Sequence, residues 1–338
     1  MSWSRRSFIR SSVFATVASL VPLPAFERRA TDDRLLPRRL YEGATVGLVS
    51  PAGVISSPAD VNAVQETLAS LGLNAHLGRN ALSRRGYLAG TDAERATDLM
   101  EMFEDDRIDA ILALRGGWGL NRILERLNFG TIRRNPKIAM GFSDITSLLL
   151  AMYARSGVVS FHGPVGISTW SSRTVNHMKS VLFDGGTPIL TNPPSEPIHT
   201  ICGGRARGRL VGGNLSVITS MLGSPFLPDW SGHLLFLEDV DERVYKIDRK
   251  LTQLAMAGIL DQVEGVIWGQ CSNCTSGANV PSLTLQEVLN DHLVPRGKPA
   301  YYGALIGHIR DKFTLPIGIE AEMDADHGSI TLLEPAVV

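Results

Sequence analysis

The sequence predicts an α/β protein with two domains, and three observations support this fold class. Short apolar runs alternate with stretches of helical periodicity in the first half of the chain, which is typical of a parallel sheet covered on both faces. The length of 338 residues suggests two domains. A proline-rich polar stretch at 187–198 separates the halves. We expect an N-terminal parallel-sheet domain at 40–185, a linker at 186–204 and a smaller mixed α/β domain at 205–338.

The first half opens with a strand and a helix. Residues 44–50 form an apolar run that ends at a Pro-Ala-Gly turn, as a buried strand would. Ser57 and Pro58 supply a helix cap and a first-turn proline, and apolar residues then recur at helical spacing up to Gly72. The alternation continues with predicted helices at 92–103, 120–127 and 145–154 and predicted strands at 109–114, 138–142 and 158–161.

The second half shows the same two patterns in a less regular order. Its short apolar runs predict strands, and its stretches of helical periodicity predict helices. We expect strands at 234–237, 263–268 and 330–333 and helices at 244–257 and 284–293.

The first 30 residues differ in composition from the rest. Two adjacent arginines, Arg5 and Arg6, precede an apolar, small-residue stretch at 13–26, which is the order of a twin-arginine export signal. Two prolines break the apolar stretch, so we expect no permanent membrane anchor. This segment predicts a periplasmic protein with its signal at 1–30, and a plain basic tail is the alternative.

Charge and cysteine content exclude several classes of protein. The 33 basic and 34 acidic residues leave no basic excess for binding nucleic acid. The three cysteines do not form a dense disulfide framework. Cys271 and Cys274 form either a local disulfide or two inert thiols, because zinc would need two further ligands at matching spacing. We predict no metal site.

The strongest local signal surrounds Ser143. An apolar run at 138–142 stops at this serine and turns directly into a helical pattern, which is the outline of a nucleophile elbow. Gly141 would give the turn room. The usual elbow has a second glycine two residues after the serine, where this chain has Ile145. On spacing alone, an ordinary helix cap at Ser143 is the simpler interpretation.

A glycine-rich turn follows the predicted strand at 109–114. Its sequence is Arg115-Gly116-Gly117-Trp118-Gly119, and it lies at the sheet edge where α/β proteins bind ligands. The N–H of Gly117 could donate to an oxyanion, although a plain tight turn is the alternative. The spacing differs from a dinucleotide-binding fingerprint.

Seven segments, in order, give the chain a resemblance to the LD-carboxypeptidases from about residue 45 to 329. They are Arg-Gly-Gly-Trp-Gly from 115, Gly-Phe-Ser-Asp-Ile-Thr from 141, Phe-His-Gly-Pro from 161, Gly-x-Leu-x-Gly-Gly-Asn-Leu from 208, Leu-Phe-Leu-Glu-Asp from 235, Ile-Asp-Arg-x-Leu from 247, and Gly-His followed by Leu-Pro-Ile-Gly between 307 and 318.

The resemblance implies a Ser-His-Glu triad at Ser143, Glu238 and His308. By the same resemblance, the backbone N–H groups of Gly117 and Asp144 would hold the oxyanion. The fold implied is an N-terminal domain similar to class I glutamine amidotransferases and a C-terminal swivelling β/β/α domain, with the active site between them.

Three further residues are candidate substrate contacts. His162 is a rival base and, by the resemblance, a wall of the substrate site. Trp118 belongs to the glycine-rich turn. Arg249 follows the acidic run at 238–242, with which it would pair, and the alternative is that it holds a substrate carboxylate.

The resemblance implies that the protein removes the terminal D-alanine from murein tetrapeptides. It implies no metal or other cofactor for this reaction. A homodimer is also expected by resemblance. A microcin C-type peptidase that cleaves aminoacyl-nucleotide amides is the alternative within the family, and an aromatic residue such as Trp170 would favour it. A periplasmic ligand-binding protein, which needs no nucleophile, is the alternative from another class.

Overall fold

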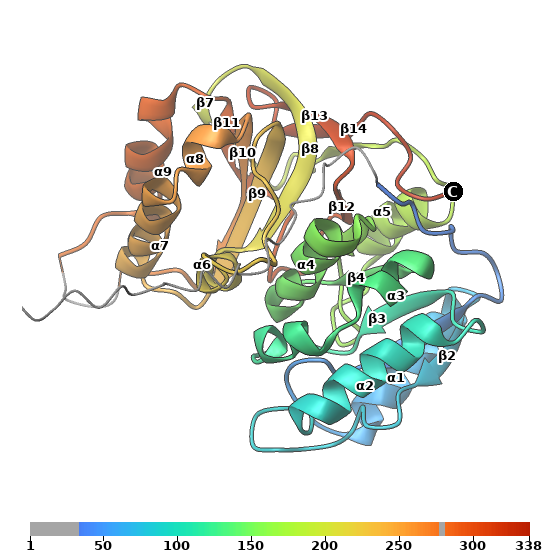
Figure 1. Ribbon diagram of the computed structural model, residues 1–338. Helices are drawn as coiled ribbons and strands as arrows, with labels where there is room; N and C mark the ends of the chain where they lie inside the picture. The colour runs from blue at the N-terminus through green and yellow to red at the C-terminus, as the bar shows by residue number, and fades with distance from the viewer. Residues whose placement is uncertain (1–33, 277–280) are drawn as a thin grey trace, which may run out of the picture.

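The computed structural model describes residues 34–276 and 281–338, so the predicted export signal at 1–30 lies outside it. In this part of the chain, two sheets lie side by side, each with its own helices (Figure 1). The first sheet and its helices occupy the lower right of that view, and the second sheet occupies the upper left. The predicted α/β class and the parallel first sheet are confirmed.

The first sheet has the strand order β12-β5-β4-β3-β1-β2. Its parallel strands are β1 (Thr45–Val49), β2 (Asn74–Leu77), β3 (Ala110–Ala113), β4 (Ile138–Gly141) and β5 (Ser160–His162). Strand β12 (Leu315–Ile317) joins β5 in the antiparallel direction. Parallel strands are buried on both faces, which explains their continuous apolar runs.

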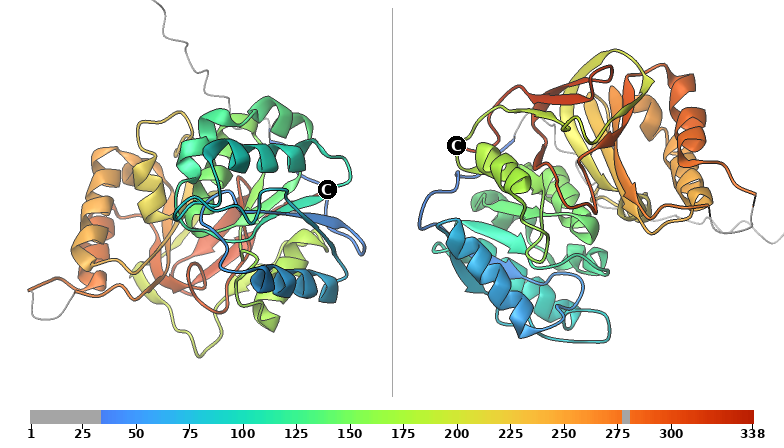
Figure 2. Two further views of the ribbon diagram at one scale, coloured as in Figure 1. Left: turned by 90° about the horizontal axis from the view of Figure 1, so that it is seen from below. Right: turned by 180° about the vertical axis from the view of Figure 1, so that it is seen from behind.

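Helices cover both faces of this sheet. They are α1 (Pro58–Ser70), α2 (Asp92–Glu104), α3 (Phe129–Arg134), α4 (Thr146–Ser156) and α5 (Ser172–Leu182). The left view of Figure 2 shows α2, α3 and α4 on one face and α1 and α5 on the other. As predicted, Ser57 caps α1, and its hydroxyl accepts from the N–H of Asp60 in a capping box.

The helix expected at 120–127 is a 3₁₀ helix at Leu120–Arg126 rather than an α-helix. Its buried residues Leu120 and Ile123 are three apart, a spacing that places two side chains on one face of a 3₁₀ turn. None of the helices within 34–276 and 281–338 combines the length and apolarity needed to cross a membrane.

The second sheet has the order β6-β14-β13-β8-β9-β10-β11-β7. Its central parallel strands are β8 (Arg205–Asn214), β9 (His233–Val240), β10 (Gly265–Ser272) and β11 (Ala300–Ala304). Its antiparallel flanking strands are β6 (Ile189–Thr191), β7 (His199–Cys202), β13 (Glu320–Asp324) and β14 (Ser329–Leu332).

The helices of this half are α6 (Leu215–Ser220), α7 (Val244–Met256), α8 (Ile259–Gln262) and α9 (Leu285–Leu293), with a 3₁₀ turn at Val294–Arg296. Figure 1 shows α7, α8 and α9 on the side of the second sheet that faces away from the first. The other side of the second sheet faces α4 and the first sheet, and β8 contacts both α4 and β12.

The segment predicted as a linker, 186–204, is part of the second sheet. Strand β6 pairs with β14 at one edge, and β7 pairs with β11 at the opposite edge. The predicted linker therefore also contributes two short edge strands to the second sheet. Prolines flank these short strands, and strand edges tolerate proline because not every N–H there must pair.

One segment of the predicted C-terminal domain crosses back to the first sheet. After β11 the chain leaves the second sheet, adds β12 to the edge of the first, and returns to β13. The connection at 305–314 therefore runs between the two sheets. This crossing is what brings His308 to the boundary between them.

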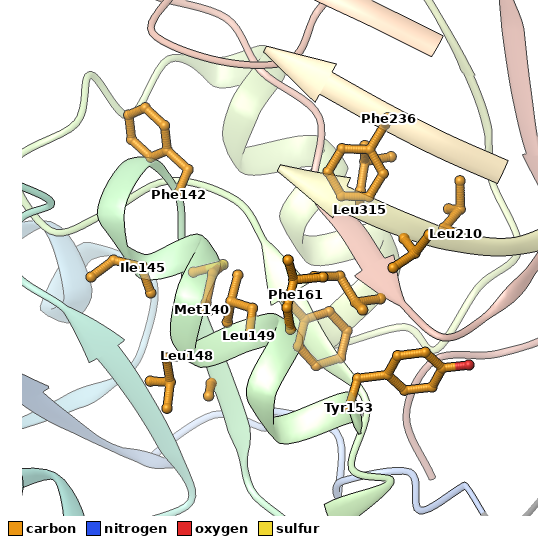
Figure 3. Close-up of a cluster of buried hydrophobic side chains, with 14 of the residues drawn as sticks. Met140, Phe142, Ile145, Leu148, Leu149, Tyr153, Phe161, Leu210, Phe236 and Leu315 are labelled. Carbon is orange, nitrogen blue, oxygen red and sulfur yellow. The ribbon is translucent and has the colours of Figure 1, made fainter. Parts of the chain in front are cut away.

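An apolar cluster joins the sheets beside this boundary. Figure 3 shows Leu315 beside Phe236 of β9, with Leu210 of β8 on the same side and with Phe161 of β5 and Leu149 of α4 on the side of the first sheet. All five side chains are buried. Burial of apolar surface from both sides stabilises the relative position of the two sheets.

Candidate active site

A cavity of about 780 Å³ lies where the carboxyl ends of strands from both sheets meet. Gly117 follows β3 and Ser143 follows β4, whereas Asn214 ends β8 and Asp239 lies near the end of β9; all four line the cavity together with His308. Ligands of α/β proteins bind at such strand ends. The two halves of the chain therefore build one site.

Ser143 stands at a sharp turn between β4 and α4. Its φ of +64° is in the left-handed region, which costs a residue with a side chain about 1–2 kcal/mol. No helix cap is formed by this side chain, because Phe142 and Ile145 occupy the cap positions. The interpretation of Ser143 as an ordinary helix cap is wrong, and the elbow geometry is present.

Two glycines make room for this elbow. A Cβ on Gly116 would lie 2.8 Å from Cβ of Ser143 and 3.0 Å from its Oγ. A Cβ on Gly141 would lie 2.9 Å from Cγ2 of Ile145. These approaches explain how the elbow forms with Ile145 where a second glycine is usual: the room comes from the residues before the serine and from the neighbouring loop.

His308 and Glu238 form the second part of the site. Nδ1 of His308 lies 2.8 Å from Oε2 of Glu238, whose side chain is fully buried near the end of β9. A Cβ on Gly307 would lie 2.7 Å from the same carboxylate oxygen, so only glycine fits beside this pair. With Nδ1–H donating to the carboxylate, Nε2 is the ring nitrogen left to accept a proton.

Asn214 supports the glutamate, and sequence reasoning assigned it no role. It pairs with Glu238 across β8 and β9, and its Nδ2 donates to Oε1 of Glu238 at 3.0 Å. Its Oδ1 accepts from Val217 N–H and caps α6. The sequence offered one signal for a role of Asn214, since this residue follows Gly212 and Gly213 in the Gly-x-Leu-x-Gly-Gly-Asn-Leu segment. Nothing in the neighbouring sequence indicated that its side chain would contact Glu238.

A second unpredicted residue, Lys312, braces the loop that carries His308. Its Nζ donates to the carbonyl of Ile309 at 2.5 Å and lies 5.3 Å from the ring centre of Phe142. The Phe142 ring in turn packs 4.7 Å from the imidazole of His308. Burial lowers the pKa of Lys312 to about 8.

The acidic run at the end of β9 is held by lysines and not by Arg249. Nζ of Lys250 lies 3.1 Å from Asp239 and 3.0 Å from Glu242, and Lys246 lies 3.3 Å from Glu242. Lysines four and eight residues after Glu242 face back to it along α7, a helical spacing that the sequence displays.

The candidate substrate contacts fall in three different environments. Trp118 lines the cavity, is 66% exposed and packs edge-on against Tyr87. His162 is buried behind Phe142, and burial lowers its pKa to about 3, so it is neutral. Arg249 is exposed on α7, where its guanidinium lies over the ring of Tyr245. Neither His162 nor Arg249 is among the described residues that line the cavity.

The oxyanion candidates lie on the wall nearest Ser143. Gly117 lines the cavity with a φ of +123°, and Asp144 is in the first helical turn, where N–H groups lack intrahelical partners. The Asp144 carboxylate accepts from the N–H of Leu120 at 2.9 Å and so ties the glycine-rich turn to the elbow. Burial raises the pKa of this carboxyl to about 6.

Cys271 and Cys274 form a disulfide, one of the two states the sequence left open, whereas Cys202 is free. The bridge closes a turn at the end of β10 that touches the site. Within this turn, Ser272 Oγ donates to the carbonyl of His308 at 2.8 Å. The backbone of the loop that carries His308 is thereby attached to the bridged turn.

Both halves of the chain match one family of proteins. The LD-carboxypeptidase N-terminal domain matches residues 46–163, and the LD-carboxypeptidase C-terminal domain matches residues 207–323. These ranges contain Ser143 in the first match and Glu238 and His308 in the second.

Named relatives cover most of the chain. A Bacillus subtilis (strain 168) protein described as a probable murein peptide carboxypeptidase is 40% identical over 293 residues, covering 85% of this chain and 91% of the relative. The Escherichia coli microcin self-immunity protein MccF is 27% identical over 340 residues, covering 89% and 96%. The crystal structure of a muramoyltetrapeptide carboxypeptidase from Oxalobacter formigenes has a TM-score of 0.75 at 28% identity, covering 86% and 98%.

Proposed function

The chain belongs to the LD-carboxypeptidase family of serine-type hydrolases, and from this membership we propose that it removes the terminal D-alanine of murein tetrapeptides. The bond cleaved joins the L-centre of a diamino acid to D-alanine. One observation carries the proposal: a strained serine after β4 lines the same cavity as a histidine that is hydrogen-bonded to the buried glutamate of β9.

Ser143 is the proposed nucleophile. Its Oγ attacks the carbonyl carbon before D-alanine, and its proton passes to Nε2 of His308. The C–N bond then breaks, His308 returns the proton to the amine of D-alanine, and the peptide stays esterified to Ser143. Water activated by His308 hydrolyses this ester and frees the shortened peptide.

Glu238 acts on the histidine. The 2.8 Å contact fixes the tautomer with a proton on Nδ1, and the buried carboxylate stabilises the imidazolium formed during attack. Asn214 occupies the other carboxylate oxygen and so holds the glutamate in this orientation.

The N–H groups of Gly117 and Asp144 are the proposed oxyanion donors. Such preorganised donors stabilise the negative charge that develops on the carbonyl oxygen in the transition state. The bond from Leu120 N–H to the Asp144 carboxylate supports this role, because it ties the loop of one donor to the residue that supplies the other.

Cleavage of aminoacyl-nucleotide amides is the second candidate function. It is favoured by Trp118, an exposed aromatic ring at the cavity on which a base could stack, and by the similarity to MccF. Trp170, the aromatic first considered for this role, donates from Nε1 to the carbonyl of Gly166 and does not line the cavity within the described residues.

The two functions are separated by one set of assays. Purified protein is incubated in parallel with a murein tetrapeptide and with an aminoacyl sulfamoyl adenosine, and the products are identified by mass spectrometry. The proposal predicts D-alanine release with a kcat/KM at least about 100-fold above that for the nucleotide amide, a gap of about 2.7 kcal/mol. The opposite ranking would select the second function, and turnover of neither substrate would contradict both.

We also propose that residues 1–30 direct export to the periplasm. The adjacent Arg5 and Arg6 support this proposal, as does the Cys271–Cys274 disulfide, because such bonds persist in oxidising compartments. Cell fractionation of the full chain and of an Arg5→Lys, Arg6→Lys variant tests it. Retention of only the variant in the cytoplasm is expected, and equal distribution of both would contradict export by this route.

A further inference from the structure

We infer that Arg115 binds the C-terminal carboxylate of the substrate and thereby restricts cleavage to the last peptide bond. This inference rests on the proposed carboxypeptidase function. An enzyme that releases one terminal residue needs a way to recognise the free carboxylate, and a guanidinium matches the planar carboxylate with two parallel hydrogen bonds.

Arg115 lies at the right place for this contact. It lies two residues after β3, lines the cavity, and precedes Gly116, which closely approaches Ser143. The carboxylate of D-alanine lies only about one residue, roughly 3.8 Å, beyond the bond that Ser143 attacks. A cation beside the elbow is therefore within reach of that carboxylate.

The charge of Arg115 is available to a ligand. Nη1 donates to the carbonyl of Val54 at 3.0 Å, which fixes the side chain but uses one of five N–H donors. No carboxylate among the described residues forms an ion pair with it. By contrast, the nearby Lys250 is paired with both Asp239 and Glu242.

Arg115 is also the only arginine or lysine among the described residues that line the cavity. The other carboxyl groups of the lining belong to Asp144, Asp239, Asp241 and Glu242, of which Asp239 and Glu242 are paired with Lys250. A negatively charged substrate terminus is therefore attracted to Arg115 and not to the acidic run. This difference orients the peptide, with D-alanine toward the glycine-rich turn and the rest of the stem toward the acidic run.

The test compares a tetrapeptide ending in a free carboxylate with the same peptide ending in a carboxamide. Wild type, Arg115→Gln, Arg115→Lys and the exposed control Arg126→Gln are assayed for kcat/KM, and thermal melting reports whether each is folded. Wild type and the control should prefer the acid by about 30-fold, since a charge-assisted pair is lost with the amide. Arg115→Gln should cleave the two peptides equally, and Arg115→Lys should recover part of the preference.

A second readout is independent of turnover. In a Ser143→Ala background, calorimetric binding of the acid should weaken on adding Arg115→Gln, while binding of the amide should not change. An equal loss for both peptides, or no loss, would overturn the inference while leaving the proposed function intact. Failure of wild type to release D-alanine or D-alaninamide from either peptide would instead overturn the proposed function and the inference with it.

Discussion

The backbone N–H of Asn214 donates a hydrogen bond of 3.0 Å to the hydroxyl of Thr146. Thr146 begins the helix after the elbow at Ser143, and Asn214 ends the strand beside Glu238. A Cβ on Gly213 would lie 2.5 Å from the Thr146 side chain, so the two backbones can approach only at a glycine. This contact links the serine half of the site directly to the glutamate half.

Replacing Thr146 with valine tests that link. Valine has nearly the same shape as threonine but leaves the buried N–H of Asn214 without an acceptor. This loss should lower the free energy of unfolding by about 1–3 kcal/mol. We expect a loss of that size in urea denaturation and a fall in kcat, whereas Thr146→Ser, which keeps the hydroxyl, should lose less than about 1 kcal/mol. A valine variant as stable and active as wild type would contradict the role of this bond.

Glu238→Gln should impair catalysis without unfolding the protein. The amide can no longer stabilise the imidazolium or enforce the tautomer of His308, so we expect kcat to fall by about 100- to 10,000-fold with little change in KM. Steady-state kinetics measure this effect. Glu264→Gln, an exposed glutamate before β10, is the matched control and should behave as wild type. A fall of less than tenfold for Glu238→Gln would argue against a role in a triad.

The buried carboxyl of Asp144 makes stability depend on pH. Its pKa is raised from 3.8 to about 6 in the folded protein, so the folded state binds the proton more tightly than the unfolded chain. The contribution of the Asp144 carboxyl to the free energy of unfolding is therefore fully present below about pH 4. It is lost as the pH rises toward 6 and stays lost above that pH. Asp144→Asn mimics the protonated carboxyl and keeps an acceptor for Leu120 N–H.

We expect this variant to be more stable than wild type by about 1–3 kcal/mol near neutral pH, and to match it near pH 4. Chemical denaturation at both pH values checks the prediction. A constant difference between the two proteins at both pH values would show that the carboxyl does not titrate in this range.

The Cys271–Cys274 bridge should stabilise the site locally. Because the disulfide closes a short loop, its removal should lower the free energy of unfolding by about 2 kcal/mol. The loop that carries His308 should also become less rigid. Alkylation before and after reduction should reveal one free thiol and then three. The melting temperature and the activity should both be lower in the double variant Cys271→Ser, Cys274→Ser, whereas Cys202→Ser should behave as wild type. An unchanged melting temperature in the double variant would contradict this role.

Local signals in the sequence predicted strands and helices that have a clear cap or a continuous apolar run, although helix α5 was not among the predictions. The capped helix after Ser57 and the apolar strand before Ser143 are examples, because capping and apolar runs are short-range effects. Strand β12 was missed because three residues with a central Pro316 resemble a loop, and it exists only through pairing with β5. Strand β8 was missed because arginines and glycines interrupt it.

The arginines of β8 are explained by its neighbour. Arg205, Arg207 and Arg209 form ion pairs with carboxylates of the antiparallel strand β13, more than 100 residues away. Such pairing cannot be seen from a window of sequence.

The same distinction applies to the site. Ser143 gave a local signal, but Glu238 and His308 were identified only through the resemblance, since their meeting depends on the crossing segment at 305–314. Asn214, Lys312 and Arg115 have roles that follow from contacts between distant segments.

The most direct test of the proposed reaction measures D-alanine release from a murein tetrapeptide by wild type and by Ser143→Ala under identical conditions. Wild type should release D-alanine, and the rate of the variant should be lower by at least about 1,000-fold, because the variant lacks the hydroxyl that attacks the peptide bond. A folded Ser143→Ala protein that still releases D-alanine at more than about a tenth of the wild-type rate would contradict the assignment of Ser143 as the nucleophile.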